Sequence, residues 1–377
     1  TDVPYVAIYS EYYESARLLA STFLKAVRKI NDHASVEAGI TVNYVDHELD
    51  VSTETPLYID AFYPNVAGTV NGLLAQPYVN WMQRIGSFHL NAGLRYVNFS
   101  YNNSANWEPR ISVGKSFQNH LITLAYTATS QWQQTQTYLA LANDNLPFSK
   151  SNQVALEWKH QIKTGFSLAS SIYYHQLYNV PVLPGYEQYS LINQWEDFPD
   201  GRLEPTGKGR NYGVEVAVEK RFYSDVYFMA TGSYFESLYQ VNAGYQDSRF
   251  NGKFTSTLLG GKEWKNQSRA FGIHARVLYT GGLRQAPVDV FASSLTGTTI
   301  YNVLQGYTVQ LPNYFRTDLR VSWRKNKPRY TRTISIDIQN LTNYQNLAGY
   351  YYDTFLQEVT PRYQLGTIPV LAYRVDF

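Results

Sequence analysis

The chain has 377 residues, of which 16% are charged and 16% aromatic, with 34 Tyr, no Cys and a net charge of +2. These values exclude a disulfide-stapled domain and a Cys-ligated metal site, and they argue against a soluble nucleic-acid binder, which carries a basic excess. They also argue against an acidic disordered chain, and no apolar run reaches the roughly 18 residues of a membrane-spanning helix. A single large β-structure fits this composition better than two soluble domains.

Apolar and polar residues alternate along most of the chain, whereas helical spacing is weak throughout. Ile334, Ile336 and Ile338, for example, alternate with polar residues. Strict alternation predicts strands that have one apolar and one polar face. The predicted strands cover residues 17–30, 35–50, 73–85, 88–101, 108–117, 120–130, 151–162, 166–178, 210–222, 226–238, 253–264, 270–280, 314–324, 331–341 and 368–377.

The connections between these fifteen segments alternate between short turns and long loops. The long connections are residues 52–71, 102–107, 131–150, 179–208, 239–250, 281–312 and 342–367. A soluble sandwich rarely shows this rhythm, but an outer-membrane barrel has tight periplasmic turns and long external loops. We therefore predict an all-β fold, a transmembrane antiparallel up-and-down β-barrel.

The tryptophans and the last segment support this prediction. Tyr and Trp favour the membrane–water interface, so tryptophans at equivalent places before short turns predict one aromatic girdle. These residues are Trp81, Trp158, Trp264 and Trp323. The chain ends in an alternating segment closed by Phe377, which resembles the signal read by the machinery that assembles outer-membrane barrels.

Several motifs resemble those of TonB-dependent outer-membrane receptors. Gly93-Leu94-Arg95-Tyr96 followed by Trp107-Glu108-Pro109-Arg110 is similar to a strand pair of that family, and Asn211-Tyr212-Gly213-Val214-Glu215 to one of its strand starts. The segment Ile336-Asp337-Ile338-Gln339-Asn340-Leu341-Thr342-Asn343 resembles its penultimate strand. Gly366-Thr367-Ile368-Pro369 looks like the version in Bacteroidetes-type members. Together the motifs cover residues 73–377.

The resemblance implies active import by a protein of the Gram-negative outer membrane. Members of the family are 22-stranded barrels closed by a plug domain, which an energised TonB complex rearranges to admit a scarce nutrient such as a siderophore, a metal chelate or an oligosaccharide. It implies a transporter and receptor rather than an enzyme, with outer-membrane lipids, TonB, a small nutrient ligand and, as an option, a surface lipoprotein as partners. It implies no nucleic-acid partner.

The chain departs from the family pattern because it contains no recognisable plug or TonB box, and Thr1 to Pro4 do not form a secretory signal. We therefore expect residues 1–377 to be the C-terminal portion of a barrel, with fifteen of twenty-two strands. The alternative is an additional strand at residues 3–13, which would make a complete 16-stranded, porin-like passive channel. A surface adhesin, a phage receptor or a soluble all-β binding protein are further alternatives.

No catalytic signature, cofactor motif or metal site emerges from the residues. Asp46, Glu48 and Asp50 share one face of a predicted strand and are oxygen ligands of the type that Ca²⁺ takes, but a solvated strand end explains them better. The candidates for ligand binding are aromatic residues of the long loops, because flat amphipathic rings bind at low entropy cost. These residues are Trp132, Tyr138, Tyr186, Trp195, Tyr351 and Tyr352, and packing between loops is the alternative explanation for them.

Overall fold

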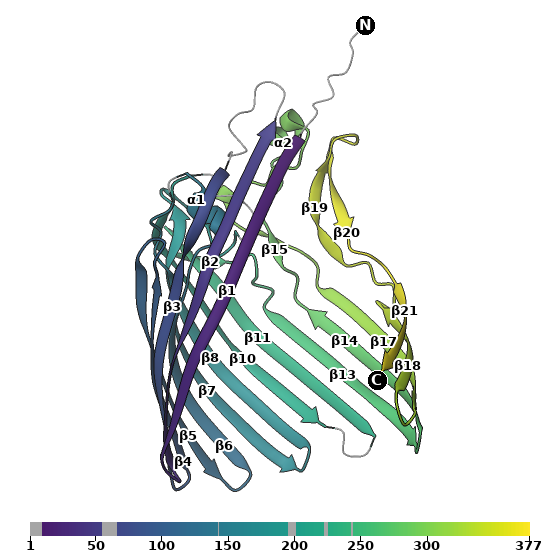
Figure 1. The fold of residues 1–377 in the computed structure, drawn as a ribbon. Helices are drawn as coiled ribbons and strands as arrows, with labels where there is room; N and C mark the ends of the chain where they lie inside the picture. Colours follow the sequence, from purple (N-terminus) through teal and green to yellow (C-terminus); the bar gives the residue numbers. More distant parts are fainter. Residues whose placement is uncertain (1–9, 55–65, 142, 195–200, 222–224, 243) are drawn as a thin grey trace.

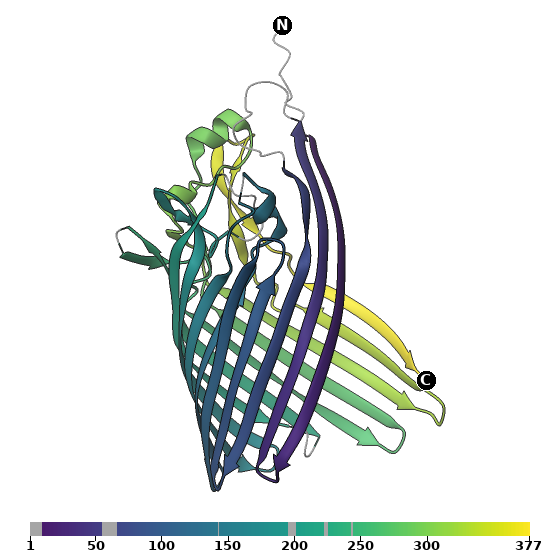
Figure 2. The same ribbon diagram turned by 60° about the vertical axis from the view of Figure 1, so that its left-hand side comes forward.

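The computed structural model is one large, curved antiparallel sheet, with long loops at one end and short turns at the other (Figures 1 and 2). The structure describes residues 10–54, 66–141, 143–194, 201–221, 225–242 and 244–377. None of the helices in this part of the chain is long and apolar enough to cross a membrane. We call the two ends of the sheet the loop end and the turn end.

Within the described residues, the sheet has seventeen strands, of which β9 and β12 are short strands in loops, which leaves fifteen strands in the wall. The prediction of an antiparallel up-and-down sheet of about fifteen strands is thus confirmed. The wall strands are β1 (Ser10–Asn31), β2 (Ala34–Glu54), β3 (Val66–Ile85), β4 (Phe88–Phe99), β5 (Ser104–Phe117), β6 (His120–Gln131), β7 (Ser149–Lys163), β8 (Phe166–Leu183), β10 (Glu204–Lys220), β11 (Val226–Val241), β13 (Phe254–Asn266), β14 (Arg269–Thr280), β17 (Tyr314–Asn326), β18 (Thr331–Gln339) and β21 (Ile368–Asp376).

The long connections carry small elements of their own, all of them at the loop end (Figure 1). The turns at the other end are short, such as the two-residue connections 32–33 and 86–87. The predicted rhythm of short turns and long loops is therefore present, except that the predicted long connection 102–107 is wrong: residues 104–107 belong to β5, and the connection between β4 and β5 is the short segment 100–103. The loop elements are α1 (Thr135–Leu139), β9 (Tyr186–Ser190), β12 (Gly244–Asp247), β15 (Arg284–Gln285), α2 (Val290–Thr296), η1 (Val303–Gln305), β16 (Val309–Gln310), β19 (Leu347–Asp353) and β20 (Glu358–Tyr363).

The first three strands are longer than their alternation predicts. β1, β2 and β3 have 22, 21 and 20 residues, whereas a strand of about 9–11 residues crosses a bilayer. Their loop-end portions continue to pair although the apolar alternation has ended, for example at Glu14 opposite Asp50. Residues 10–13 belong to β1, so a separate strand at residues 3–13 is wrong for this part, and residues 3–9 lie outside the described residues.

The two outermost strands of the wall each have one paired neighbour. In the described ranges, β1 pairs with β2 and β21 pairs with β18, and no pairing joins β1 to β21. The wall therefore has an open side in this chain. This openness matters in a bilayer, because unpaired backbone groups in hydrocarbon cost several kcal/mol each.

The two faces of the wall differ in chemistry. One outer row places Trp264 opposite Phe271 and Phe271 opposite Trp323, and all three rings are exposed, at 46%, 41% and 38%. The inner face of the same strands carries ion pairs such as Arg276 with Asp318. The buried apolar clusters lie at the loop end, under the long loops, rather than within the wall.

The Gly-Leu-Arg-Tyr and Trp-Glu-Pro-Arg motifs form an ion pair between β4 and β5. Arg95 lies directly opposite Glu108, and its Nη2 and Nε atoms are 2.5 and 2.6 Å from Glu108 Oε2. The carboxylate is fully buried and also accepts hydrogen bonds from the amide and hydroxyl of Ser130 at 2.7 and 2.6 Å. The motif therefore joins three neighbouring strands close to the loop end.

Removing this carboxylate tests its structural importance. We expect Glu108→Ala to lower the free energy of unfolding by about 3–5 kcal/mol, because Arg95 then loses its ion-pair partner and lies next to a buried void. Denaturant unfolding of the protein in lipid vesicles measures the change. Glu157→Ala, which removes an exposed inward carboxylate, is the control and should cost much less. Equal losses in the two variants would contradict this assignment.

Candidate functional site

The loop between β6 and β7 packs into an aromatic core at the loop end. Tyr138 of α1 is 1% exposed, and its neighbours include Phe99 and Phe148. Its hydroxyl accepts a hydrogen bond from the Gln133 amide at 3.1 Å, and burial raises the pKa of Tyr138 to about 12. Trp132 meets Phe99 edge-on, with ring centroids 5.0 Å apart. This loop is therefore held against β3 and β4 by its own apolar core.

The helix α1 is also attached to the first two strands. The His47 ring lies between the Ser15 hydroxyl at 2.9 Å and the Thr135 hydroxyl at 2.8 Å. His47 points inward, so the neighbouring carboxylates of Asp46 and Glu48 alternate to the outer face. In the parts of the chain that the structure describes, no group of three or more His, Cys, Asp or Glu side chains is arranged to hold a metal ion.

A cavity of about 600 Å³ lies beside this loop, on the inner side of the wall. Trp132 contributes an aromatic surface, and a set of amide side chains contributes donors and acceptors. The amides belong to Gln131, Gln133, Gln134, Gln153 and Gln194. Amides can both donate and accept hydrogen bonds, so this lining suits a polar ligand that offers both kinds of group.

A second cavity of about 530 Å³ continues from the first toward the middle of the wall. The two share Gln153, His175 and Phe250, so they are neighbours. The second cavity reaches Glu157 and Glu215, both exposed on the inner face. A ligand could therefore extend from the amide-rich upper cavity to two carboxylates below it.

An ion-pair cluster positions the loop that carries Phe250. Lys253 Nζ lies 2.6 Å from Glu236 and 3.1 Å from Asp247, and Arg284 approaches Asp247 at 2.7 Å. Burial works against the charged amine, but the two carboxylates keep the pKa of Lys253 above its usual value. The ammonium group thus stays charged at physiological pH and holds the loop beside the cavities.

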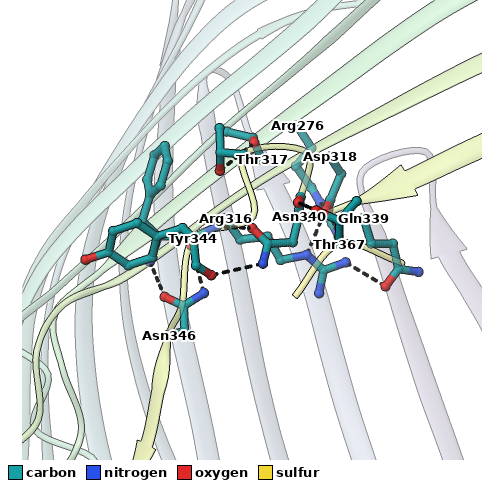
Figure 3. A network of polar contacts seen from close by, with 11 residues as sticks. Arg276, Arg316, Thr317, Asp318, Gln339, Asn340, Tyr344, Asn346 and Thr367 are labelled. Atoms are coloured by element: carbon teal, nitrogen blue, oxygen red, sulfur yellow. Dashed lines mark hydrogen bonds and ion pairs between the residues drawn. The ribbon is translucent and has the colours of Figure 1, made fainter. Parts of the chain in front are cut away.

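A second polar network anchors the long loop between β18 and β21 (Figure 3). The Asn340 side chain forms two hydrogen bonds with the Tyr344 backbone, at 3.0 and 3.1 Å. The backbone amide of Asn340 donates a hydrogen bond to the Asp318 carboxylate at 3.0 Å. The Thr367 hydroxyl donates to the Asn340 carbonyl at 2.8 Å. Asn340 has a φ of 50°, a left-handed conformation that Asn tolerates well.

The same network ties the loop to the wall. The Asn346 side chain accepts from the Phe315 amide and donates to the Phe315 carbonyl, both at 2.8 Å. Asp318 accepts in turn from Arg316 at 2.7 Å and Arg276 at 2.9 Å. The Asn-Leu-Thr-Asn motif is therefore a loop anchor in this structure, and the contacts of its side chains are all within the protein.

The predicted binding residues occupy different environments. Trp132 lines the upper cavity, whereas Tyr138 is buried in the loop core. Tyr186 is 52% exposed at the start of β9, Tyr352 is 6% exposed, and Tyr351 is half-buried in the same hairpin of β19 and β20. Trp195 lies outside the described residues. The structure thus brings Trp132 and Tyr138 into one loop and does not gather the described members into a single site.

The amides and Phe250 were missed as candidates. Four glutamines fall within residues 131–136, and that density was a usable signal. No sequence signal marked Phe250, because its place beside the cavity depends on ion pairs between Lys253 and residues on β11 and β12.

Comparisons with known proteins give a family. A family model described as TonB dependent receptor-like, beta-barrel matches residues 11–341. A comparison with curated proteins gives no significant sequence match.

Solved structures of similar fold include three iron-uptake proteins. The ferric yersiniabactin uptake receptor of Yersinia pestis is 12% identical with a TM-score of 0.66, and the match covers 98% of this chain and 56% of that one. The ferric preacinetobactin receptor of Acinetobacter baumannii is 13% identical with a TM-score of 0.62, and the match covers 98% of this chain and 55% of that one. An iron transporter of Neisseria meningitidis is 12% identical with a TM-score of 0.60, and the match covers 96% of this chain and 54% of that one. The chain thus spans about half the length of the structures that it matches.

The loop anchor can be tested apart from any ligand. We expect Asn346→Ala to cost about 1–3 kcal/mol locally, because two backbone groups of Phe315 lose their partner. Hydrogen exchange should then become faster in residues 340–367 and stay unchanged in β5 to β8. Asn313→Ala is the control, since this side chain donates to the exposed Tyr279 hydroxyl at 3.0 Å. Unchanged exchange in residues 340–367 would mean that Asn346 does not anchor the loop.

Proposed function

We propose that this chain, which belongs to the TonB-dependent receptor-like β-barrel family, forms the wall and ligand-binding loops of a transporter that imports a scarce nutrient. Proteins of this family reside in the Gram-negative outer membrane, and so does this chain. The family consists of transporters and receptors rather than enzymes. The loop end is accordingly external and the turn end periplasmic.

The observation that carries this proposal is the amide-lined cavity beneath the packed external loops. It lies on the inner side of the wall, next to Trp132, and leads downward to Glu157 and Glu215. A ligand held there would already be inside the barrel and below the loop surface. This position suits capture followed by inward transfer.

We further propose that the complete wall has twenty-two strands and encloses a plug domain, with residues 1–377 as the C-terminal portion of the barrel. The single neighbours of β1 and β21 support additional strands, and so does the match to about half of each longer structure. Inner-face charges such as Arg320 and Asp337, 3.4 Å apart, then face the plug or water. A Bacteroidetes-type origin and a surface lipoprotein partner belong to the same proposal.

The cargo class is a siderophore, another metal chelate or an oligosaccharide. The similar structures include a ferric preacinetobactin receptor, an iron transporter and a ferric yersiniabactin uptake receptor, and the amides of the cavity equally suit hydroxyl-rich ligands. The proposed ligand contacts in the external loops are Trp132, Tyr186, Tyr351, Tyr352 and Trp195. Tyr138 contributes to binding through the packing of its loop.

Uptake by cells carrying the intact protein tests this function. We expect import of one ligand from a panel of ferric siderophores, other metal chelates and oligosaccharides, and we expect it to stop when TonB is deleted. Trp132→Ala should weaken binding of that ligand about tenfold, or about 1.4 kcal/mol, without loss of folded protein. Tyr234→Ala, which removes an exposed ring on the outer face of β11, is the control. Flux that is independent of TonB and limited only by solute size would support a porin instead.

A further inference from the structure

Three basic side chains form a row across adjacent strands at the turn end of the wall. Arg269 of β14 lies directly opposite Lys325 of β17, and Lys325 lies directly opposite Arg332 of β18. Directly opposite residues of an antiparallel pair share a face and have Cβ atoms about 4.5–5.5 Å apart. The three cations therefore project side by side from one face of the sheet. We call this set the basic row.

The basic row belongs to the outer, lipid-facing side of the wall. One step toward the membrane centre, Phe271 lies opposite Trp323, and both rings are exposed on the same face as the basic row. Trp and other aromatic side chains concentrate at the membrane–water interface. The basic row is two residues closer to the turns, which places it at the depth of the lipid headgroups, where long basic side chains extend.

In the described part of the chain, no acidic partner neutralises this row. Among the residues that the structure describes, no acidic side chain lies within ion-pair distance of Arg269, Lys325 or Arg332, because the nearby acidic side chains point to the inner face. Glu263 pairs inward with Arg324 and Lys265, both at 3.4 Å. The Arg332 guanidinium lies 4.8 Å from the centre of the Tyr330 ring, a contact that orients the cation but leaves its charge in place.

Like charges directly opposite each other destabilise an antiparallel pair, and here the repulsion extends over three strands. The next turn adds Lys327 and Arg329, both exposed, so the local charge is strongly positive. An anion would remove this repulsion. Because exposed aromatic rings adjoin the row, an occupant that has both an anionic head and an apolar tail fits the surface better than a free ion.

We propose that the basic row binds the phosphate of an anionic phospholipid in the periplasmic leaflet. The row lies at the turn-end termini of β14, β17 and β18, and the turn end is opposite the loop end (Figure 1), so the lipid comes from the leaflet next to the short turns. Each Lys or Arg near an anionic membrane surface adds to the electrostatic attraction. Three of them on adjacent strands therefore make a lipid site that also ties β14, β17 and β18 together.

Native mass spectrometry on the protein extracted from outer membranes tests the site. Phosphatidylglycerol and phosphatidylcholine with identical acyl chains are added to the detergent-solubilised protein. We expect preferential retention of phosphatidylglycerol, and we expect the combined variant Arg269→Gln, Lys325→Gln and Arg332→Gln to lose about tenfold or more of that affinity. Binding of phosphatidylcholine should not change. Equal retention of the two lipids by the unmodified protein would overturn the proposal.

A matched control separates the site from a change in net charge. The combined variant Arg202→Gln, Lys208→Gln and Arg362→Gln removes the same charges from exposed positions at the loop end. It should bind phosphatidylglycerol as the unmodified protein does. An equal loss in both combined variants would show a general charge effect and overturn the proposal.

A third variant gives a second readout that does not depend on the folding of the neutralised protein. Lys325→Glu places an acid between Arg269 and Arg332, so it should raise the thermal stability in lipid-free detergent and abolish the stabilisation by phosphatidylglycerol. Inorganic phosphate distinguishes a lipid from a free anion. If phosphate alone stabilises the unmodified protein as much as the lipid does, the row is a general anion site and the lipid assignment is wrong.

Discussion

The structure depends on one constraint, which is that every backbone amide and carbonyl within the bilayer must find its partner on a neighbouring strand. A meander of antiparallel strands joined by short turns and long loops satisfies this requirement for the wall strands between β1 and β21, whereas these two outermost strands each pair with one neighbour in the described ranges. Because successive side chains of a strand point to opposite faces, the side chains of the wall alternate between lipid and lumen. The wall consequently has no interior core of its own. The buried apolar clusters that other folds place between layers are found beneath the external loops.

That arrangement gives the recognisable motifs a structural meaning. The Arg95–Glu108 pair holds β4 and β5 in register near the loops, and Asn340 and Asn346 anchor the last long loop to the wall. Both sets of side chains contact the protein itself. These side chains therefore stabilise the wall and its loops, and they carry no information about the cargo.

The wall strands could be predicted well from the sequence because apolar and polar residues alternate within each lipid-facing strand. This alternation can be seen in one segment without knowledge of the others. Ile334, Ile336 and Ile338 identify β18 without reference to any other part of the chain. The loop-end portions of β1 to β3 were harder, since water replaces lipid there and the alternation fades. The loops were hardest. Tyr138 was a plausible ligand contact from its position, but its burial depends on Phe99 and Phe148, which lie on either side of it in sequence and meet it only in the fold.

Two packed clusters at the loop end frame the cavity in which we propose that the ligand binds. Tyr138 and the Lys253 cluster order their loops through contacts that need no ligand, so the cavity between them is formed before any ligand arrives. Preorganisation of this kind reduces the entropy cost of binding. The lining amides keep some freedom, because an amide can turn to present either a donor or an acceptor. In the import that we propose, this rigid frame with an adaptable polar lining would hold the ligand in the upper cavity and release it toward the carboxylates of Glu157 and Glu215 once the upper interactions are broken.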